Sequence, residues 1–277
     1  MIEVTGLTKR FGPKAAVDDL SFSVKKGEVL GFLGPNGAGK STTMRMVTGF
    51  LPVTAGEISI CDISMINNPQ EAKRKIGYLP ESAPLYNDMS VQGFLKFCAS
   101  MRGLAGSARR EAVAKSIETC FLESVYRQSI GTLSKGYRHR TCLAQSLLHD
   151  PEVLVLDEPT DGVDPVGRAA IRETVTDLAK GGTTVFINSH LLMEVEMICD
   201  RIAILKDGLI LREGTLQDLT PDTGEIQLHL AGELPSSELQ TQLFAGLKVE
   251  HSVTEKPSDP GYLLRLSADD EQLNALI

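Results

Sequence analysis

The segment Gly34-Pro35-Asn36-Gly37-Ala38-Gly39-Lys40-Ser41 decides the fold of this chain. It matches the pattern GxxxxGK[ST], in which glycines let backbone N–H groups curl around a phosphate. Lys40 is expected to reach the β- and γ-phosphates of a nucleotide such as ATP. Ser41 is expected to place its hydroxyl on Mg²⁺, with Thr42 as a neighbouring phosphate contact. A glycine-rich turn that ends in a surface lysine is the alternative.

The residues around this motif favour phosphate binding. Residues 29–33, Val-Leu-Gly-Phe-Leu, are apolar on both faces, which is typical of a strand in the middle of a sheet. A helix is expected directly afterwards over residues 41–48, ended by Gly49 and Pro52. The positive end of such a helix faces the same anion that the loop surrounds. The order strand, loop, helix is therefore the one that the chemistry requires.

A second apolar strand, Val153-Leu154-Val155-Leu156, runs into Asp157-Glu158-Pro159. Parallel sheets place their ligands at the carboxyl ends of the strands, where these two carboxylates would lie. Asp157 is expected to hold Mg²⁺ through water, and Glu158 to polarise the water that attacks the γ-phosphate. Taken alone, the same residues are consistent with a helix cap and turn. Together with the phosphate loop they predict a catalytic site.

Elsewhere in the first 220 residues, the periodicity predicts an α/β domain with a helical insertion. The insertion is expected over residues 90–148, and a βαβ unit around the helix Pro165–Lys180 predicts a parallel sheet. Further strands are predicted at residues 2–4, 16–24, 28–33, 57–60, 153–156 and 184–187. A hairpin is predicted between residues 202–205 and 209–212, with Asp207-Gly208 at its turn.

Beyond residue 220 the pattern changes, so a second domain is expected there. Thr220-Pro221-Asp222-Thr223-Gly224 marks the boundary. Strands are predicted at residues 225–231, 248–254 and 261–267, with helices at 236–245 and from about Ala268. This β-α-β-β-α order is one strand short of a split βαβ, or ferredoxin-like, sandwich. We divide the chain into residues 1–220 and a small α+β accessory domain, 221–277; a loosely docked extension is the alternative.

Composition excludes several classes of function. The net charge of −8 repels nucleic-acid backbones and anionic lipid, so no nucleic-acid partner is expected. No apolar run approaches the ~20 residues that cross a bilayer, and the N-terminal residues lack the apolar stretch of a signal peptide. We therefore expect a cytosolic chain that reaches any partner through specific surfaces.

The segment Leu133-Ser134-Lys135-Gly136-Tyr137 resembles the LSGGQ signature of ATP-binding cassette (ABC) ATPases. With the two motifs above, the resemblance covers about residues 1–220. It implies the P-loop NTPase fold of an ABC cassette: a mixed central sheet, an antiparallel β subdomain and a helical subdomain at about residues 83–150. From the residues themselves, Ser134 suits the N-cap of a helix that continues from Tyr137 to Leu148.

The same resemblance implies a shared site between two chains. Two copies, or this chain and a related ATPase, would stack head to tail. Each signature would then close over the ATP that the other chain's phosphate loop holds. Asp164, in Thr-Asp-Gly-Val-Asp-Pro, matches the family's D-loop, which communicates across such a dimer. It also suits a helix N-cap before Pro165, and both roles are compatible.

Two further residues acquire roles through the resemblance. Phe11 corresponds to the aromatic that stacks on adenine, although a buried core aromatic explains it nearly as well from sequence alone. His190 follows the predicted strand Val185-Phe186-Ile187 and matches the switch histidine that contacts the γ-phosphate. A histidine that only caps or packs is the alternative for this position.

Three residues depart from the usual family pattern. Glu81 stands where most relatives have a glutamine that contacts Mg²⁺, and a carboxylate still ligates that ion. Lys135 replaces a signature glycine and adds positive charge near a phosphate site, and Tyr137 replaces the signature glutamine. Together these variants resemble the branch of ABC ATPases that works with type-2 export permeases, including drug, polysaccharide and gliding-motility exporters.

The leading hypothesis is an ATPase at the cytoplasmic face of the plasma (inner) membrane that drives export through a separate integral permease. Leu85 and Tyr86, beside the nucleotide-sensing loop, are expected to line the docking groove for that permease. A soluble ABC ATPase acting on ribosomes or nucleic acid is the alternative. It is disfavoured by the single cassette, the absence of sustained heptads and the acidic charge. A regulatory module that holds ATP without turnover is disfavoured by Glu158.

Overall fold

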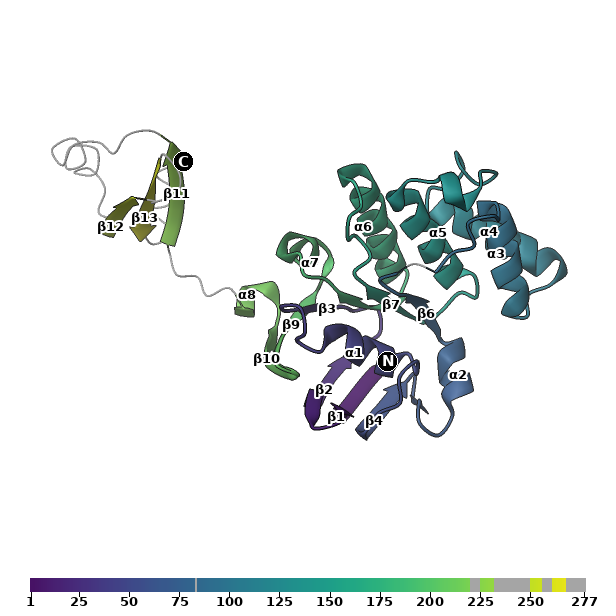
Figure 1. Cartoon of the computed structure of the whole chain (residues 1–277), viewed down its shortest axis with the longest axis horizontal. Helices are drawn as coiled ribbons and strands as arrows, with labels where there is room; N and C mark the ends of the chain where they lie inside the picture. Colours follow the sequence, from purple (N-terminus) through teal and green to yellow (C-terminus); the bar gives the residue numbers. More distant parts are fainter. Residues whose placement is uncertain (83, 220–224, 232–249, 256–260, 268–277) are drawn as a thin grey trace. The chain divides into compact units, whose positions relative to one another are not determined.

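The computed structural model describes residues 1–82, 84–219, 225–231, 250–255 and 261–267. The chain divides into two compact units, Met1–Leu219 and Thr220–Ile277 (Figure 1). Among the described residues, no helix combines the length and the apolar character needed to cross a membrane.

A six-stranded mixed sheet forms the centre of the first unit. Its strands are, in spatial order, β10 (Leu209–Gly214), β9 (Arg201–Lys206), β3 (Val29–Leu33), β8 (Thr184–Asn188), β7 (Val153–Asp157) and β6 (Ile76–Leu79). All neighbours are parallel except β10, which forms an antiparallel hairpin with β9. Every residue of β7 and β8 is buried. The apolar runs thus form inner strands, as predicted, because helices cover both faces of a parallel sheet.

A four-stranded antiparallel sheet packs against the central one. It contains β2 (Lys14–Val24), β1 (Ile2–Phe11), β4 (Ala55–Ile60) and β5 (Ile63–Ser64), in that order. Three phenylalanines join the two sheets, since the ring of Phe22 lies 5.0 Å from that of Phe32 and 5.3 Å from that of Phe186. The resulting core fixes the phosphate loop, which follows β3, relative to both sheets.

Some helices of the first unit pack on the central sheet, and others form a separate group beside it (Figure 1). The helices α3 (Val91–Met101), α4 (Gly106–Thr119) and α5 (Lys135–Leu147) contact one another and share a second buried core with β7 and β8. This group confirms the predicted helical insertion. The other helices are α1 (Lys40–Val47), α2 (Pro69–Arg74), α6 (Pro165–Lys180), α7 (Leu192–Ile198) and α8 (Leu216–Leu219), and a 3₁₀ turn spans Ile130–Thr132.

The structure corrects several predicted boundaries. The first strand was predicted to end at residue 4, but β1 continues to Phe11 because register shifts allow it to stay paired with β2. Neither β6 nor α2 was predicted, since both are short. The hairpin prediction is confirmed: Asp207 and Gly208 both have positive φ, 51° and 82°, as a tight two-residue turn requires.

The second unit contains a three-stranded antiparallel sheet in the order β11, β13, β12. Its strands are β11 (Glu225–Ala231), β12 (Glu250–Glu255) and β13 (Gly261–Ser267), close to the three predicted strands. The helices predicted at residues 236–245 and from Ala268 lie outside the described residues.

Candidate nucleotide-binding and hydrolysis site

A cleft of about 460 Å³ lies at the carboxyl ends of the central strands, around the phosphate loop. It brings together the predicted residues Phe11, Glu81 and Glu158 with most of that loop. The full lining is Phe11, Lys14, Ala15, Ala16, Asn36, Gly37, Gly39, Lys40, Ser41, Thr42, Glu81, Glu158, Asn188 and Asp207. Gly34 and Pro35 enter the loop, and Ala38 is buried within it.

Gly39 shows why the loop needs glycine where it turns into α1. It occupies the N-cap position with φ 102°, a region that side chains rarely adopt, and an added Cβ would lie 2.6 Å from the Ala16 carbonyl oxygen. The tight turn lets the N-terminus of α1 face the cleft, where its free N–H groups favour an anion.

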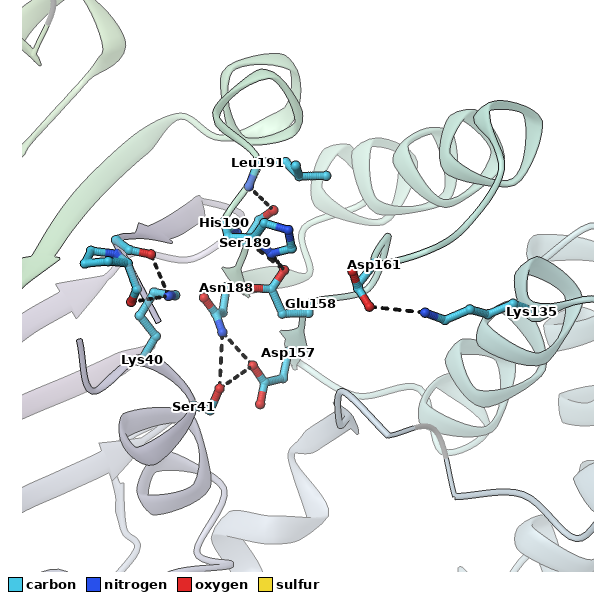
Figure 2. Close-up of polar contacts among 12 residues, drawn as sticks. Lys40, Ser41, Lys135, Asp157, Glu158, Asp161, Asn188, Ser189, His190 and Leu191 are labelled. Carbon is cyan, nitrogen blue, oxygen red and sulfur yellow. Dashed lines mark hydrogen bonds and ion pairs between the residues drawn. The ribbon is translucent and has the colours of Figure 1, made fainter. Parts of the chain in front are cut away.

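Lys40 is almost fully buried, with 6% of its surface exposed. Its ammonium donates to the carbonyl oxygens of Gly34 at 2.7 Å and Pro35 at 3.1 Å, so the loop curls around its own lysine (Figure 2). Burial lowers the pKa of Lys40, while the carboxylates of Glu158 and Asp157 oppose this effect. The alternative of a surface lysine is therefore wrong.

Asp157, at the end of β7, organises a small polar cluster. Its Oδ1 accepts hydrogen bonds from Ser41 Oγ at 3.1 Å and from Asn188 Nδ2 at 2.6 Å (Figure 2). Its buried Oδ2 and the Oδ1 of Asn188 have no hydrogen-bond partner in the described part of the chain. Buried polar groups are normally paired, so these oxygens are suited to bind a cation or a hydrogen-bond donor.

The residues of this cluster fit Mg²⁺. The ion prefers oxygen ligands and keeps several waters, so one carboxylate and one hydroxyl beside a phosphate site suffice. No cluster of three or more His, Cys, Asp or Glu side chains at metal-binding distance occurs in the described segments.

Glu158 and His190 form the polar contact next to this cluster. His190 Nδ1 lies 2.8 Å from Glu158 Oε2, and the His190 backbone N–H approaches the same oxygen at 3.4 Å (Figure 2). Burial raises the pKa of Glu158, and the interactions with His190 partly reverse this rise. The histidine therefore faces the carboxylate, and the arrangement suits a base oriented by a neighbour.

Two predicted residues lie at the exposed rim of the cleft. Phe11 is 53% exposed, so the alternative of a buried core aromatic is wrong. The Lys9 ammonium lies 5.3 Å from the centre of its ring, and the rest of the ring is free to stack. Glu81 is also exposed where it lines the cleft.

The signature-like segment lines a different cavity, of about 470 Å³. Ser134 caps α5 as predicted, accepting from the Tyr137 backbone N–H at 3.4 Å. Leu133 packs against the helical core, and the Tyr137 ring lies 4.1 Å from the Arg140 guanidinium carbon. Lys135 pairs with Asp161 of the loop after β7. Since the two cavities share no lining residue, each segment serves a separate surface.

Asp164 stands at the N-cap position of α6, with Pro165 following, but its side chain makes no capping hydrogen bond. The predicted N-cap position of Asp164 before Pro165 is therefore confirmed, although the side chain does not supply the capping bond. The close approach of α5 explains where it goes: a Cβ at Gly136 would lie 2.9 Å from Asp164 Oδ1. The side chain is directed at the signature cavity, which it lines.

Sequence reasoning missed Asn188 and Asp207. Asn188 is the last residue of β8 and stands in register with Asp157. The rule that ligands gather at carboxyl ends of parallel strands would have found it, had the strand been extended by one residue. Asp207 lines the cleft because its hairpin touches the phosphate loop, where the Gly208 N–H donates to the Ala38 carbonyl at 3.1 Å. Only the folded chain brings those two segments together.

Comparison of the sequence with known families identifies one class of protein. The family described as "ABC transporter" matches residues 17–161, just over half of the chain. The chain therefore belongs to the ABC transporter family. It is an ATP-binding subunit of that family and an ATPase, as the sequence resemblance implied.

Curated relatives are similar over most of the first unit. The linearmycin resistance ATP-binding protein LnrL of Bacillus subtilis is 39% identical over 235 residues, which are 84% of this chain and 76% of LnrL. The bacitracin transport ATP-binding protein BcrA of Bacillus licheniformis is 37% identical over 214 residues, 77% of this chain and 69% of BcrA. YbhF of Escherichia coli, a probable multidrug ABC transporter ATP-binding protein, is 38% identical over 219 residues, but the chain spans only 38% of its length.

Solved structures confirm the predicted cassette fold. The structure of an ATP-binding subunit of an ABC transporter has a TM-score of 0.72 at 28% identity, covering 79% of this chain and 91% of that one. The cassette MJ0796, a dimer in a post-hydrolysis state bound to ADP and Pi, has a TM-score of 0.71 at 25% identity, covering 78% and 99%. Cassettes with this fold thus bind nucleotide and dimerise.

Proposed function

We propose that this chain hydrolyses ATP to drive export through a separate integral membrane permease, acting at the cytoplasmic face of the plasma (inner) membrane. The observation that carries the proposal is the 2.8 Å contact between His190 and Glu158, beside Lys40, Ser41 and Asp157. Export is supported by the relatives, which are described as proteins of linearmycin resistance, bacitracin transport and Nod factor export.

Glu158 is proposed to activate the attacking water. As a carboxylate with a raised pKa, it is a stronger base than an exposed glutamate, and proton transfer improves as the pKa approaches the working pH. His190 orients it by donating from Nδ1 to Oε2. The histidine is also proposed to contact the γ-phosphate, since 43% of its side chain is exposed and so accessible to a ligand.

The phosphates are proposed to lie against the loop of residues 34–42, with Lys40 exchanging its bonds to loop carbonyls for bonds to phosphate oxygens. Ser41 and Asp157 would hold Mg²⁺, with Glu81 at the rim as a further oxygen ligand. When bound, this ion would neutralise charge that develops on the phosphate oxygens. Phe11 would stack on the adenine.

Turnover is proposed to require two chains, either two copies or this chain and a related ATPase. Residues Leu133 to Tyr137 line or flank a cavity that lies apart from their own chain's cleft. They would therefore cover the ATP of the partner chain. Asp164, which lines the same cavity, is proposed to link the two sites.

The permease is proposed to dock beside Glu81, on an aromatic surface. Tyr86 is 58% exposed, and its ring lies 6.1 Å from that of Phe94 and 5.8 Å from that of Phe97. Leu85, the preceding residue, is partly buried and packs against the helical core. Replacing Leu85 and Tyr86 with charged residues should abolish co-purification of the permease from solubilised membranes while nucleotide affinity stays unchanged. Undiminished co-purification would reject this docking site.

Residues 221–277, which make up nearly all of the second unit, are proposed to be an accessory domain of the cassette, of incomplete ferredoxin-like type. Its antiparallel order β11, β13, β12 supports a small sandwich of that type.

The decisive experiment is the substitution Glu158→Gln. The amide keeps the shape of the side chain but cannot accept a proton, so turnover should fall at least a hundredfold, roughly the loss seen when one electrostatic group of a catalytic site is removed. ATP should then accumulate in a stable dimer, visible by size-exclusion chromatography. Glu152→Gln, at an exposed carboxylate paired with Lys75, is the matched control and should leave both readouts unchanged. A chain that only binds ATP would show no difference between Glu158→Gln and wild type.

A further inference from the structure

The N-terminal part of α5, from Lys135 to His139, contacts the loop after β7 at two points. Lys135 Nζ donates to Asp161 Oδ2 at 3.1 Å (Figure 2). His139 Nδ1 lies 3.2 Å from the carbonyl oxygen of Pro159, and this oxygen can only accept, so the contact requires the hydrogen on Nδ1. Lys135 and His139 are four residues apart on one helix and therefore lie on the same face. That face contacts Pro159 and Asp161, both in the segment that directly follows Glu158.

The segment needs such support because Glu158 has an unusual backbone. Its φ of 50° is uncommon for a residue with a side chain, and such a conformation persists only where surrounding contacts hold it. On the sheet side, the Glu158 N–H donates to the Asn188 carbonyl at 3.0 Å. Within the loop, the Asp161 N–H donates to the Glu158 carbonyl at 3.2 Å. The contacts from Lys135 and His139 complete the support on the helix side.

The two contacts differ in burial. His139 is 4% exposed, whereas the side chains of Lys135 and Asp161 are 51% and 48% exposed. An ion pair as exposed as Lys135–Asp161 contributes little to global stability. We therefore expect this ion pair to affect the position of the loop and not the global stability of the fold.

The first turn of α5 also carries the signature segment. Ser134 precedes Lys135, caps the helix and lines the cavity of about 470 Å³. Because the first turn of a helix moves as a unit, a shift at Ser134 displaces Lys135 with it. Lys135 in turn holds Asp161, three residues after Glu158.

We propose that Lys135 and His139 are positioning residues that tie the signature turn to the Glu158 carboxylate of the same chain. The inference rests on the proposed function, in which Glu158 activates water and Ser134 meets the ATP of a partner. Contact of Ser134 with nucleotide in one site then sets the position of Glu158 in the other site.

The ion pair is tested by a double-mutant cycle with steady-state ATP hydrolysis as the readout. Lys135→Met and Asp161→Ala should each lower kcat about tenfold and leave KM for ATP within about twofold, since misplacement by ~1 Å can cost up to about a hundredfold in rate. The double variant should be no worse than either single one, because both remove the same contact.

The buried contact is tested with two substitutions of different chemistry. His139→Leu removes the donor and should lower kcat by a similar factor. His139→Asn supplies an amide N–H in place of Nδ1 and should restore activity, provided thermal unfolding shows both variants folded. Lys75→Met is the matched control, because its pair with Glu152 is 39% and 46% exposed and lies outside the site. This control should keep wild-type kcat.

Wild-type kcat in Lys135→Met and His139→Leu would overturn the proposal. Additive losses in the Lys135–Asp161 cycle would also overturn it, since Lys135 would then act on phosphate alone. The proposal would also be overturned if His139→Asn folds but its kcat stays as low as that of His139→Leu. A Glu158→Gln variant with normal turnover would instead refute the proposed function, so the two failures are distinguishable.

Discussion

The nucleotide cleft around Lys40 and the signature cavity around Ser134 have similar volumes, about 460 Å³ and about 470 Å³. Their charged groups nevertheless differ in burial. Lys40, Asp157 and Glu158 are all less than 10% exposed, and the carboxylates of Asp157 and Glu158 interact by charge with the ammonium of Lys40. Lys135 in the other cavity is about half exposed. The cleft is thus organised within one chain, whereas the signature cavity offers polar groups to something outside it.

This difference has an energetic reason. Buried charges are costly unless they are paired, and the three buried charged groups of the cleft all have partners within the same chain. Exposed groups have no such requirement, because water already solvates them. We therefore expect substitutions in the cleft to affect nucleotide binding by the single chain, and a substitution at Ser134, which faces the signature cavity, to affect the assembly.

Lys40→Met should give the largest effect on nucleotide binding. It removes the charge that meets the phosphates, and ATP affinity should fall roughly a hundredfold even in a dilute, monomeric sample. Titration with a fluorescent ATP analogue measures this. Lys26→Met, at an exposed lysine, should bind as wild type. An unchanged ATP affinity in Lys40→Met would contradict the conclusion that the cleft binds nucleotide within a single chain.

Ser134→Glu should distinguish the role of the signature cavity from that of the cleft most clearly. It places a negative charge where the partner's phosphates are proposed to lie, so ATP-driven dimerisation and turnover should fall about tenfold or more, while affinity of the single chain stays unchanged. Size-exclusion chromatography with ATP, in a Glu158→Gln background, measures the dimer. Ser134→Thr keeps the helix cap and should dimerise normally. A weakened affinity in the isolated chain would contradict the assignment of Ser134 to another chain's site.

Asn188→Ala should have a smaller effect within the cleft. Asp157 loses the donor at 2.6 Å that orients it, and loss of such a supporting group typically costs about 10–100-fold in metal affinity. The Mg²⁺ concentration that gives half-maximal ATPase activity should rise accordingly. Asn67→Ala, on an exposed loop, is the control. An unchanged Mg²⁺ requirement would show that the cluster does not hold the ion.

The smallest effect is expected in the pH dependence of turnover. Burial raises the pKa of Glu158, so kcat should fall as the pH falls through a value above the ordinary glutamate pKa of about 4.3. His190 lowers that pKa, so His190→Gln should move the acid limb to higher pH. The measurement is kcat against pH for both proteins at saturating ATP. A limb that stays in place or moves to lower pH would contradict the role of His190.

Local patterns predicted a large part of this cassette. The strand at Val29–Leu33, the glycine loop and the start of α1 are consecutive in sequence, so their order carries most of the information. The short strand β6 and the long continuation of β1 were missed, because their pairing depends on partners far along the chain. The exposed position of Phe11 was left open for the same reason.

The sequence by itself determined the family, the phosphate loop and the two carboxylates after β7, since each is a short run whose chemistry depends on neighbouring residues. Only the tertiary structure decided that Asn188 would stand beside Asp157, through the parallel register of β7 and β8. It also decided that Lys135 and His139 would face the loop of Glu158. Register and packing join residues that are distant in sequence, and no local pattern records such a distance.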